Sequence, residues 1–203
     1  MWGRILLIAL CLIGLGLVSA DAATKTRFGA KLDNQSQPSN SFDHVCNVNA
    51  NNDDCTWIMG QAYHCEFGSC NHGEIAPKTG IIGRLYLVAC DPGTFALQIA
   101  SVVPSRQQAK VTHTGPQINY QGDPQHCNGN TFKVESFAVN VPIVKGQYLA
   151  AVTQKLGFVY CSGGGSNDIL LYDLPLADHP TPGGFRKANG HDDCLMLLEA
   201  EYK

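Results

Sequence analysis

From Trp57 to the C-terminus, short runs rich in Val, Ile, Leu, Tyr and Phe alternate with segments rich in Gly, Pro, Asn and Asp. Such runs, bounded by turn-forming residues, are typical of β-strands, and no stretch keeps a convincing helical period. The pattern predicts an all-β fold, a disulfide-stapled β-sandwich or jelly roll behind a short irregular N-terminal leader. The nine expected strands are Trp57–Tyr63, Ile81–Ala89, Thr94–Val102, Lys110–Thr114, Thr131–Val141, Gln147–Thr153, Gly157–Tyr160, Ile169–Tyr172 and Leu195–Tyr202.

Two of these segments leave a choice open. In Thr131–Val141 the apolar residues fall first on even and then on odd positions. This switch indicates either a β-bulge near Ser136 or a central strand covered on both faces. Leu195–Tyr202 has high helix propensity and an aspartate before it that can cap a helix. We expect a strand there, because a final strand completes the sheet that its neighbours form.

The N-terminus has the three parts of a secretory signal peptide. A short basic start, Met1–Arg4, precedes the apolar run Ile5–Val18. The tripeptide Val18-Ser19-Ala20 then has small residues at its first and last positions, as signal peptidase requires. The apolar run is shorter than the roughly twenty residues that a membrane-spanning helix needs. We therefore expect cleavage after Ala20, and a secreted, extracellular protein with no membrane span after cleavage.

The cysteines fit an oxidising compartment. The chain has nine, and Cys11 lies in the expected signal peptide, which leaves eight and predicts up to four disulfides. The first four should pair largely among themselves, whereas Cys127–Cys161 and Cys90–Cys194 are the pairs expected among the rest. Zinc would also suit some of the cysteine and histidine spacings, but secretion favours disulfides. The eight are Cys46, Cys55, Cys65, Cys70, Cys90, Cys127, Cys161 and Cys194.

Composition divides the mature chain into a leader and one domain. Residues 21–54 are polar and are expected to form a flexible leader, and residues 55–203 are expected to form a single β-sandwich domain. The leader holds an N-glycosylation sequon at Asn34, so the protein is expected to be a glycoprotein if its host glycosylates.

Charge and motifs narrow the function. The formal net charge is −3, which gives no extended basic surface, so nucleic acid is not an expected partner. The chain lacks the Gly-x-Ser-x-Gly motif of hydrolases and the lysine of a phosphate-binding loop. A binding module is therefore favoured over an enzyme. The alternatives are a small secreted hydrolase with dispersed loop residues, or a structural component of a matrix or coat.

Aromatic and amide side chains in the expected loops are candidates for contact with a ligand. Sugar rings stack on aromatic rings, and their hydroxyls bond to amides and carboxylates. We expect loops at one end of the sandwich to recognise carbohydrate or an extracellular surface or matrix protein. The candidates are Tyr120, Asn128, Asn130, Ser166, Asn167, Asp168 and Phe185.

Clusters of acidic residues indicate one cofactor, calcium. Two segments end in Asp-Asp-Cys, and a further aspartate follows a glycine-rich loop. Carboxylate oxygens in loops are the hard ligands that calcium requires. The candidate ligands are Asp53, Asp54, Asp168, Asp192 and Asp193.

Overall fold

The computed structural model describes residues 25–30, 32, 44–46, 54–59, 75–125, 132–161, 169–177, 184–192 and 194–203. The expected signal peptide and the Asn34 sequon lie outside these residues. The described chain is nearly all β-strand, with one 3₁₀ turn at Pro104–Arg106. The strands form two antiparallel sheets and two small strand pairs, which confirms a disulfide-containing β-sandwich.

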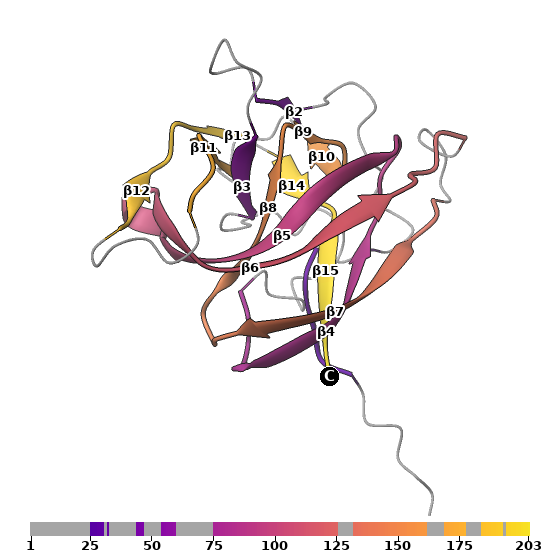
Figure 1. Ribbon diagram of the computed structural model, residues 1–203, viewed down its shortest axis with the longest axis horizontal. Coiled ribbons are helices and arrows are strands. Elements are labelled where there is room, and N and C mark those ends of the chain that lie inside the picture. The colour runs from indigo at the N-terminus through magenta and orange to yellow at the C-terminus, as the bar shows by residue number, and fades with distance from the viewer. Residues whose placement is uncertain are drawn as a thin grey trace, which may run out of the picture.

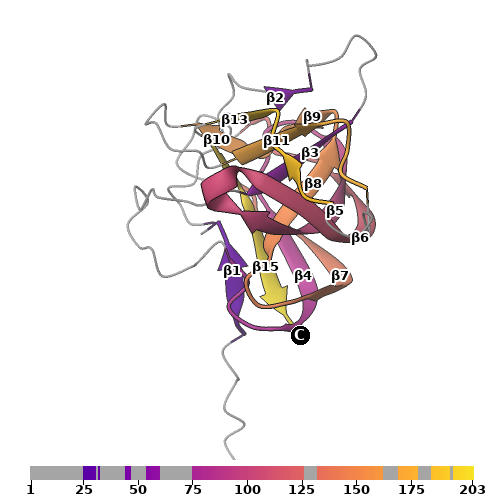
Figure 2. The same cartoon turned by 90° about the vertical axis from the view of Figure 1, so that its left-hand side faces the viewer.

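The smaller sheet has four strands in the order β1-β15-β4-β7 (Figure 1). These strands are β1 (Arg27–Gly29), β15 (Leu198–Tyr202), β4 (Gly80–Leu87) and β7 (Glu135–Ile143). Figure 2 shows them together at one end of the molecule, below the strands of the larger sheet. The sheet therefore forms one layer of the sandwich.

The larger sheet has seven strands in the order β12-β6-β5-β8-β3-β11-β13. Its central strands are β6 (Gln108–Tyr120), β5 (Gly93–Val103), β8 (Tyr148–Thr153), β3 (Cys55–Met59) and β11 (Ile169–Asp173). Its outer strands are β12 (Arg186–Lys187) and β13 (Gly190–Asp192). The two small pairs join β10 (Val159–Cys161) to β14 (Cys194–Met196), and β2 (His44–Val45) to β9 (Lys155–Leu156).

The seven-stranded sheet is strongly curled. Its two edge strands, β12 and β13, are consecutive in the chain and are separated only by Ala188 and Asn189. The amide of Ala188 donates to Gln107 O (2.8 Å), and the amide of Asn189 donates to Leu171 O (2.8 Å). One short segment therefore bonds to both sides of the sheet, which requires the sheet to curve back on itself.

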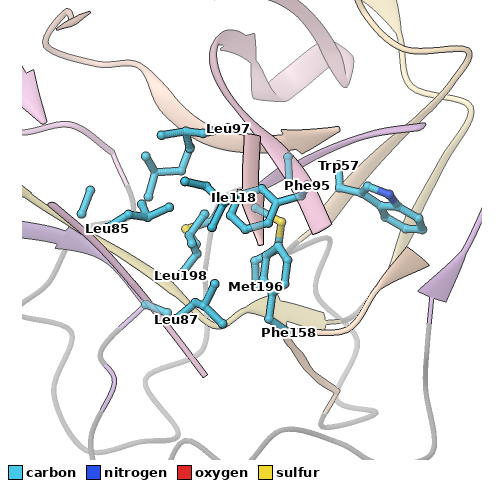
Figure 3. Close-up of a cluster of buried hydrophobic side chains, with 14 of the residues drawn as sticks. Trp57, Leu85, Leu87, Phe95, Leu97, Ile118, Phe158, Met196 and Leu198 are labelled. Atoms are coloured by element: carbon cyan, nitrogen blue, oxygen red, sulfur yellow. The ribbon is translucent and has the colours of Figure 1, made fainter. Parts of the chain in front are cut away.

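The main core lies between the two sheets. Figure 3 shows Phe95, Leu97 and Ile118 of the larger sheet facing Leu85, Leu87 and Leu198 of the smaller sheet. Because side chains alternate along a strand, the other face of the larger sheet buries a second cluster. This cluster lies inside the curl and consists of Ile58, Ala100, Ala109, Val111, Tyr148, Ala150, Leu170, Tyr172 and Leu176.

Each of the nine predicted segments contains a described strand or part of one, whereas five further short strands are not predicted by the sequence. These are β1, β2, β9, β12 and β13. The C-terminal segment is strand rather than helix, divided at Leu197 into β14 and β15.

Neither alternative for Thr131–Val141 holds. Strand β7 begins only at Glu135, and from there its odd positions face inward while its even positions are exposed, so no bulge at Ser136 is needed. It is an edge strand with one exposed face, not a central strand covered on both faces. The carboxylate of Glu135 accepts hydrogen bonds from the amides of Gln121 and Gly122, which fixes the start of the strand. The register shift lies further along, opposite Ile82 and Arg84.

The predicted leader is not irregular throughout. Strand β1 pairs with β15, and Phe28 is only 1% exposed in the main core. Lys25 Nζ lies 2.8 Å from Glu201 Oε1, and the Arg27 guanidinium forms ion pairs with Glu199 (3.1 Å) and Glu201 (3.0 Å). Residues 25–29 are therefore part of the sandwich.

Candidate functional site

A pocket of 380 Å³ opens at the end of the larger sheet where β5 and β3 begin and β6 and β8 end. Four separate stretches of chain contribute to it, and one of these includes the end of the β4–β5 loop. Its lining consists of Asp54, Asp91, Pro92, Gly93, Thr94, Phe95, Ala96, Gln117, Tyr120, Val152, Thr153, Gln154, Lys155 and Gly157.

The strand register sets the pocket floor. Ala96 of β5 pairs with Val152 of β8 on one side and with Gln117 of β6 on the other. Two small apolar side chains therefore lie beside one carboxamide. One step nearer the sheet end, Thr94 pairs with Asn119, and the Thr94 hydroxyl donates to Asn119 Oδ1 (2.7 Å).

Tyr120 joins the pocket to the core. It is 3% exposed, and its ring lies 5.6 Å from Phe158 and 6.1 Å from Phe95, centroid to centroid. Its hydroxyl lies against Gly93 and Gly157, where an added Cβ would meet that oxygen at 2.2 Å and 2.9 Å. Tyr120 therefore lines the pocket, and its ring packs against the core.

The wall formed by Gln154 and Lys155 is held by a disulfide and by Thr153. Cys46 and Cys55 form a disulfide with a Cα–Cα distance of 5.9 Å, and the amide of Cys46 donates to Gln154 O (2.9 Å). The Thr153 hydroxyl lies 2.9 Å from Thr94 O and 3.0 Å from Lys155 O. The turn after β8 is therefore anchored to both β3 and β5.

The wall that carries Asp91 is fixed by a tight backbone contact. Gly122 has φ +69°, and a Cβ there would lie 2.4 Å from Cys90 O. The amide of Asp123 donates to Ala89 O (2.9 Å). The loop after β6 is thus packed directly against the loop that presents Asp91.

A buried polar network closes the sheet below the pocket. Thr56 and Gln98 are 0% and 3% exposed, and Thr56 Oγ1 lies 3.1 Å from Gln98 Oε1. The side-chain amide of Gln98 donates to Thr114 Oγ1 (3.1 Å) and to Leu176 O (3.2 Å). The backbone amide of Leu176 donates to Thr56 Oγ1 (2.8 Å). Leu176 is therefore held in the second buried cluster, inside the curl.

The rim is polar and contains charges of both signs. Asp54, Asp91 and Lys155 are exposed there, next to the carboxamides of Gln117 and Gln154. Carboxylates accept hydrogen bonds, ammonium groups donate them, and carboxamides do both. Such a rim can bind a ligand that carries several hydroxyl groups.

Few of the sequence-predicted site residues meet at this pocket. Tyr120 and Asp54 both line it, although the sequence suggested them for different ligands. Phe185 lies just before β12, 4.9 Å from Lys110 Nζ, and Asp192 lies in β13. The other candidates lie outside the described residues. These are Asn128, Asn130, Ser166, Asn167, Asp168, Asp53 and Asp193.

Sequence reasoning missed most of the rim. Asp91, Thr94, Gln117 and Gln154 lie at strand ends that are distant in sequence, and they carry no motif. Their position next to expected turns was the only signal, and many other polar residues share it. Only the register of four strands brings these residues together.

Four of the eight expected disulfide cysteines are disulfide-bonded in the described part of the chain. Cys46 pairs with Cys55, as expected for the N-terminal group, and Cys90 and Cys194 are also disulfide-bonded. The β10–β14 register sets Cys161 opposite Cys194, so the backbone offers Cys194 a neighbour other than the expected Cys90. Cys65, Cys70 and Cys127 lie outside the described residues.

In the described ranges, no group of three or more His, Cys, Asp or Glu side chains is arranged to hold a metal ion. Calcium binding therefore stays a prediction. The described part of the chain also contains no helix of the length and apolarity needed to cross a membrane.

Comparison with known proteins leaves the fold and the pocket as the basis for function. No family model matches the sequence, and neither a curated protein nor a solved structure matches it.

Proposed function

We propose that this protein is an extracellular binding module that recognises carbohydrate in the pocket at the end of the seven-stranded sheet. The observation that carries the proposal is the pocket itself. Its 380 Å³ lies in the size range of small-molecule sites, about 300–1,000 Å³. The residues of its polar rim lie at strand ends and in anchored turns rather than in long loops.

The rim chemistry favours a sugar over an apolar ligand. Sugar hydroxyls both donate and accept hydrogen bonds, and the rim offers acceptors at Asp54 and Asp91, a donor at Lys155 and both at Gln117. Ala96 and Val152 supply a small apolar floor for the less polar face of a ring. Because the backbone around these groups is fixed, little conformational entropy is lost on binding.

The disulfides support an extracellular location. Cys46, Cys55, Cys90 and Cys194 are all oxidised. Structural disulfides persist in secreted proteins and are rare in the cytosol.

A glycan-array screen of the oxidised protein, with calcium and with EDTA, tests this proposal. We expect selective binding that Asp91→Ala abolishes and that Lys133→Ala, at an exposed residue outside the pocket lining, leaves intact. Loss of binding in EDTA would assign calcium a role. A blank array, or binding that survives Asp91→Ala, contradicts carbohydrate recognition in this pocket.

One observation favours hydrolysis as a second candidate. The pocket brings together two carboxylates, those of Asp54 and Asp91, and paired carboxylates are the minimum that glycoside hydrolysis requires. Incubating each array hit with the protein and following chain length by mass spectrometry separates the two functions. Cleavage that Asp54→Asn or Asp91→Asn abolishes would make the protein a hydrolase, and intact glycan would leave it a binding module.

A further inference from the structure

A second charged surface lies at the turn between β5 and β6, beside β12. Three basic residues gather there, Arg106, Lys110 and Lys187, and we refer to them as the basic corner. In Figure 1 this turn and β12 lie at the far left, away from β9, whose first residue lines the pocket. The basic corner is therefore separate from the proposed carbohydrate pocket.

The strand register places two of these side chains on one face. Lys187 pairs with Gln108, and Arg186 pairs with the buried Ala109. Side chains alternate along a strand, so Lys110 shares the face of Gln108 and Lys187. Diagonal neighbours of this kind have Cα atoms about 7–8 Å apart.

The backbone of the basic corner is well anchored. Arg106 ends the 3₁₀ turn, and Gln107 follows in the left-handed conformation with φ 51°. Gln107 O accepts hydrogen bonds from the amide of Ala188 (2.8 Å) and from the Tyr172 hydroxyl (3.3 Å). The turn that carries Arg106 is thus fastened to the segment that carries Lys187.

An aromatic ring supports the third cation. Lys110 Nζ lies 4.9 Å from the centroid of the Phe185 ring. This cation–π contact limits the positions that the lysine side chain adopts while keeping its charge near the surface. The sequence predicts that Phe185 contacts a ligand. In this site its ring instead holds the Lys110 side chain in position.

The charges of the basic corner are not neutralised by the described chain. Across the described ranges, the ion pairs join Lys25 and Arg27 to Glu199 and Glu201, and none involves the basic corner. The neighbouring Arg186 donates to the carbonyl oxygens of Asp173 and Leu174, so its position is set by the backbone. A local field of this kind attracts anions even though the whole chain has a net charge of −3.

We propose that the basic corner binds an anionic polysaccharide through its sulfate or carboxylate groups. Disulfides such as those of this chain are typical of oxidising, extracellular compartments, and the proposed extracellular location favours a charged glycan as the polyanion. Anionic lipids are concentrated in the cytoplasmic leaflet, and they are therefore a less suitable partner. This binding is additional to sugar recognition in the pocket and does not depend on it.

Binding of the full oxidised protein to immobilised polysaccharides tests the proposal. Heparin supplies sulfate groups, polygalacturonate supplies carboxylates, and dextran is the neutral control. We expect binding to at least one charged polymer and none to dextran. Raising salt from about 0.05 M to about 0.5 M should weaken that binding at least tenfold. At the higher concentration, the attraction between exposed charges is screened beyond a few ångströms.

Charge reversal locates the binding surface. Arg106→Glu combined with Lys187→Glu should weaken binding at least tenfold, whereas the matched reversal Lys133→Glu should not. All three residues are exposed, so equal melting temperatures would show that the fold is intact. Asp91→Ala should leave polyanion binding unchanged, which separates this site from the pocket.

Three outcomes would overturn the proposal. The first is binding to dextran as strong as to the charged polymers. The second is full retention of binding by the Arg106→Glu/Lys187→Glu variant. The third is binding to anionic vesicles or to DNA without binding to either charged polysaccharide, which would assign the surface to a different class of partner.

Discussion

At the scale of single residues, Glu201 shows how a buried charge links stability to pH. Burial of its carboxyl raises the pKa, but hydrogen bonds from Lys25 and Tyr86 and the charges of Lys25 and Arg27 lower it more. The pKa of Glu201 therefore lies below the usual value of a glutamate. A group of this kind stabilises the fold above its unfolded pKa, about 4.3, and the stabilisation is lost as the pH falls through the lower folded pKa.

Glu201→Gln should therefore destabilise the protein near neutral pH and flatten the acid side of its stability profile. We expect the free energy of unfolding to fall by about 1–2 kcal/mol at pH 7, because hydrogen bonds to a charged carboxylate are lost. The loss stays moderate because the donors are partly exposed to solvent. Urea unfolding from about pH 3 to pH 7 measures the effect, with the exposed Asp91→Asn as control. Parallel profiles for wild type and Glu201→Gln would refute the assignment.

Gly122 and Gly146 separate two costs of replacing a glycine. Both have positive φ, +69° and +89°, but a Cβ at Gly122 meets backbone at 2.4 Å and one at Gly146 meets nothing within 4 Å. Gly146→Ala should cost about 1 kcal/mol for the left-handed backbone alone. Gly122→Ala should cost about 1–3 kcal/mol more, because the loop must move away from Cys90. Equal losses of stability for the two variants in thermal unfolding would show that the loops around Asp91 can move at little energetic cost.

At the scale of elements, the sequence predicts strands well where alternation is long enough to detect. In Thr94–Val102, Phe95, Leu97 and Ile99 alternate with less apolar residues, and the segment lies within β5. Strands β1, β2, β9, β12 and β13 have only two or three residues, too few to show a period. Three of them, β1, β12 and β13, pair with the edge of a longer strand, whereas β2 and β9 pair with each other. In β7 the switch in pattern reflects where the strand starts, which depends on the contacts of Glu135 with another loop.

Strand β1 gives the clearest test of an element that sequence reasoning placed in a flexible leader. Phe28 is 1% exposed and lies 5.4 Å from the Tyr202 ring, centroid to centroid. Phe28→Ala should therefore cost about 3–5 kcal/mol in urea unfolding, the usual loss for a buried aromatic side chain. Val144→Ala, at a residue that is 54% exposed, is the control and should change stability little. A loss below about 1 kcal/mol for Phe28→Ala would show that β1 does not pack in the core and belongs to a flexible leader, as the sequence predicts.

At the scale of the whole molecule, the candidate site depends on long-range register. Asp54, Asp91, Gln117 and Gln154 come from strand ends or loops far apart in sequence, and each looks like an ordinary turn residue. The same limit applies to charge. The net charge of −3 argues against a basic surface, but the fold gathers Arg106, Lys110 and Lys187 from the two strands β6 and β12 and the turn before β6. Sums over a sequence do not show how a fold distributes its charges.

The Cys46–Cys55 disulfide tests whether the two proposed sites are independent. Its loop spans nine residues, for which the chain-entropy relation gives about 2.5 kcal/mol of stabilisation. Replacing both cysteines with serine should also loosen the wall of the pocket, since Cys46 bonds to Gln154 O and Cys55 follows Asp54. Glycan affinity should therefore fall, while binding of polyanions at the basic corner stays unchanged. Equal loss of both activities in calorimetric titrations of the folded variant would mean that the two surfaces form one site.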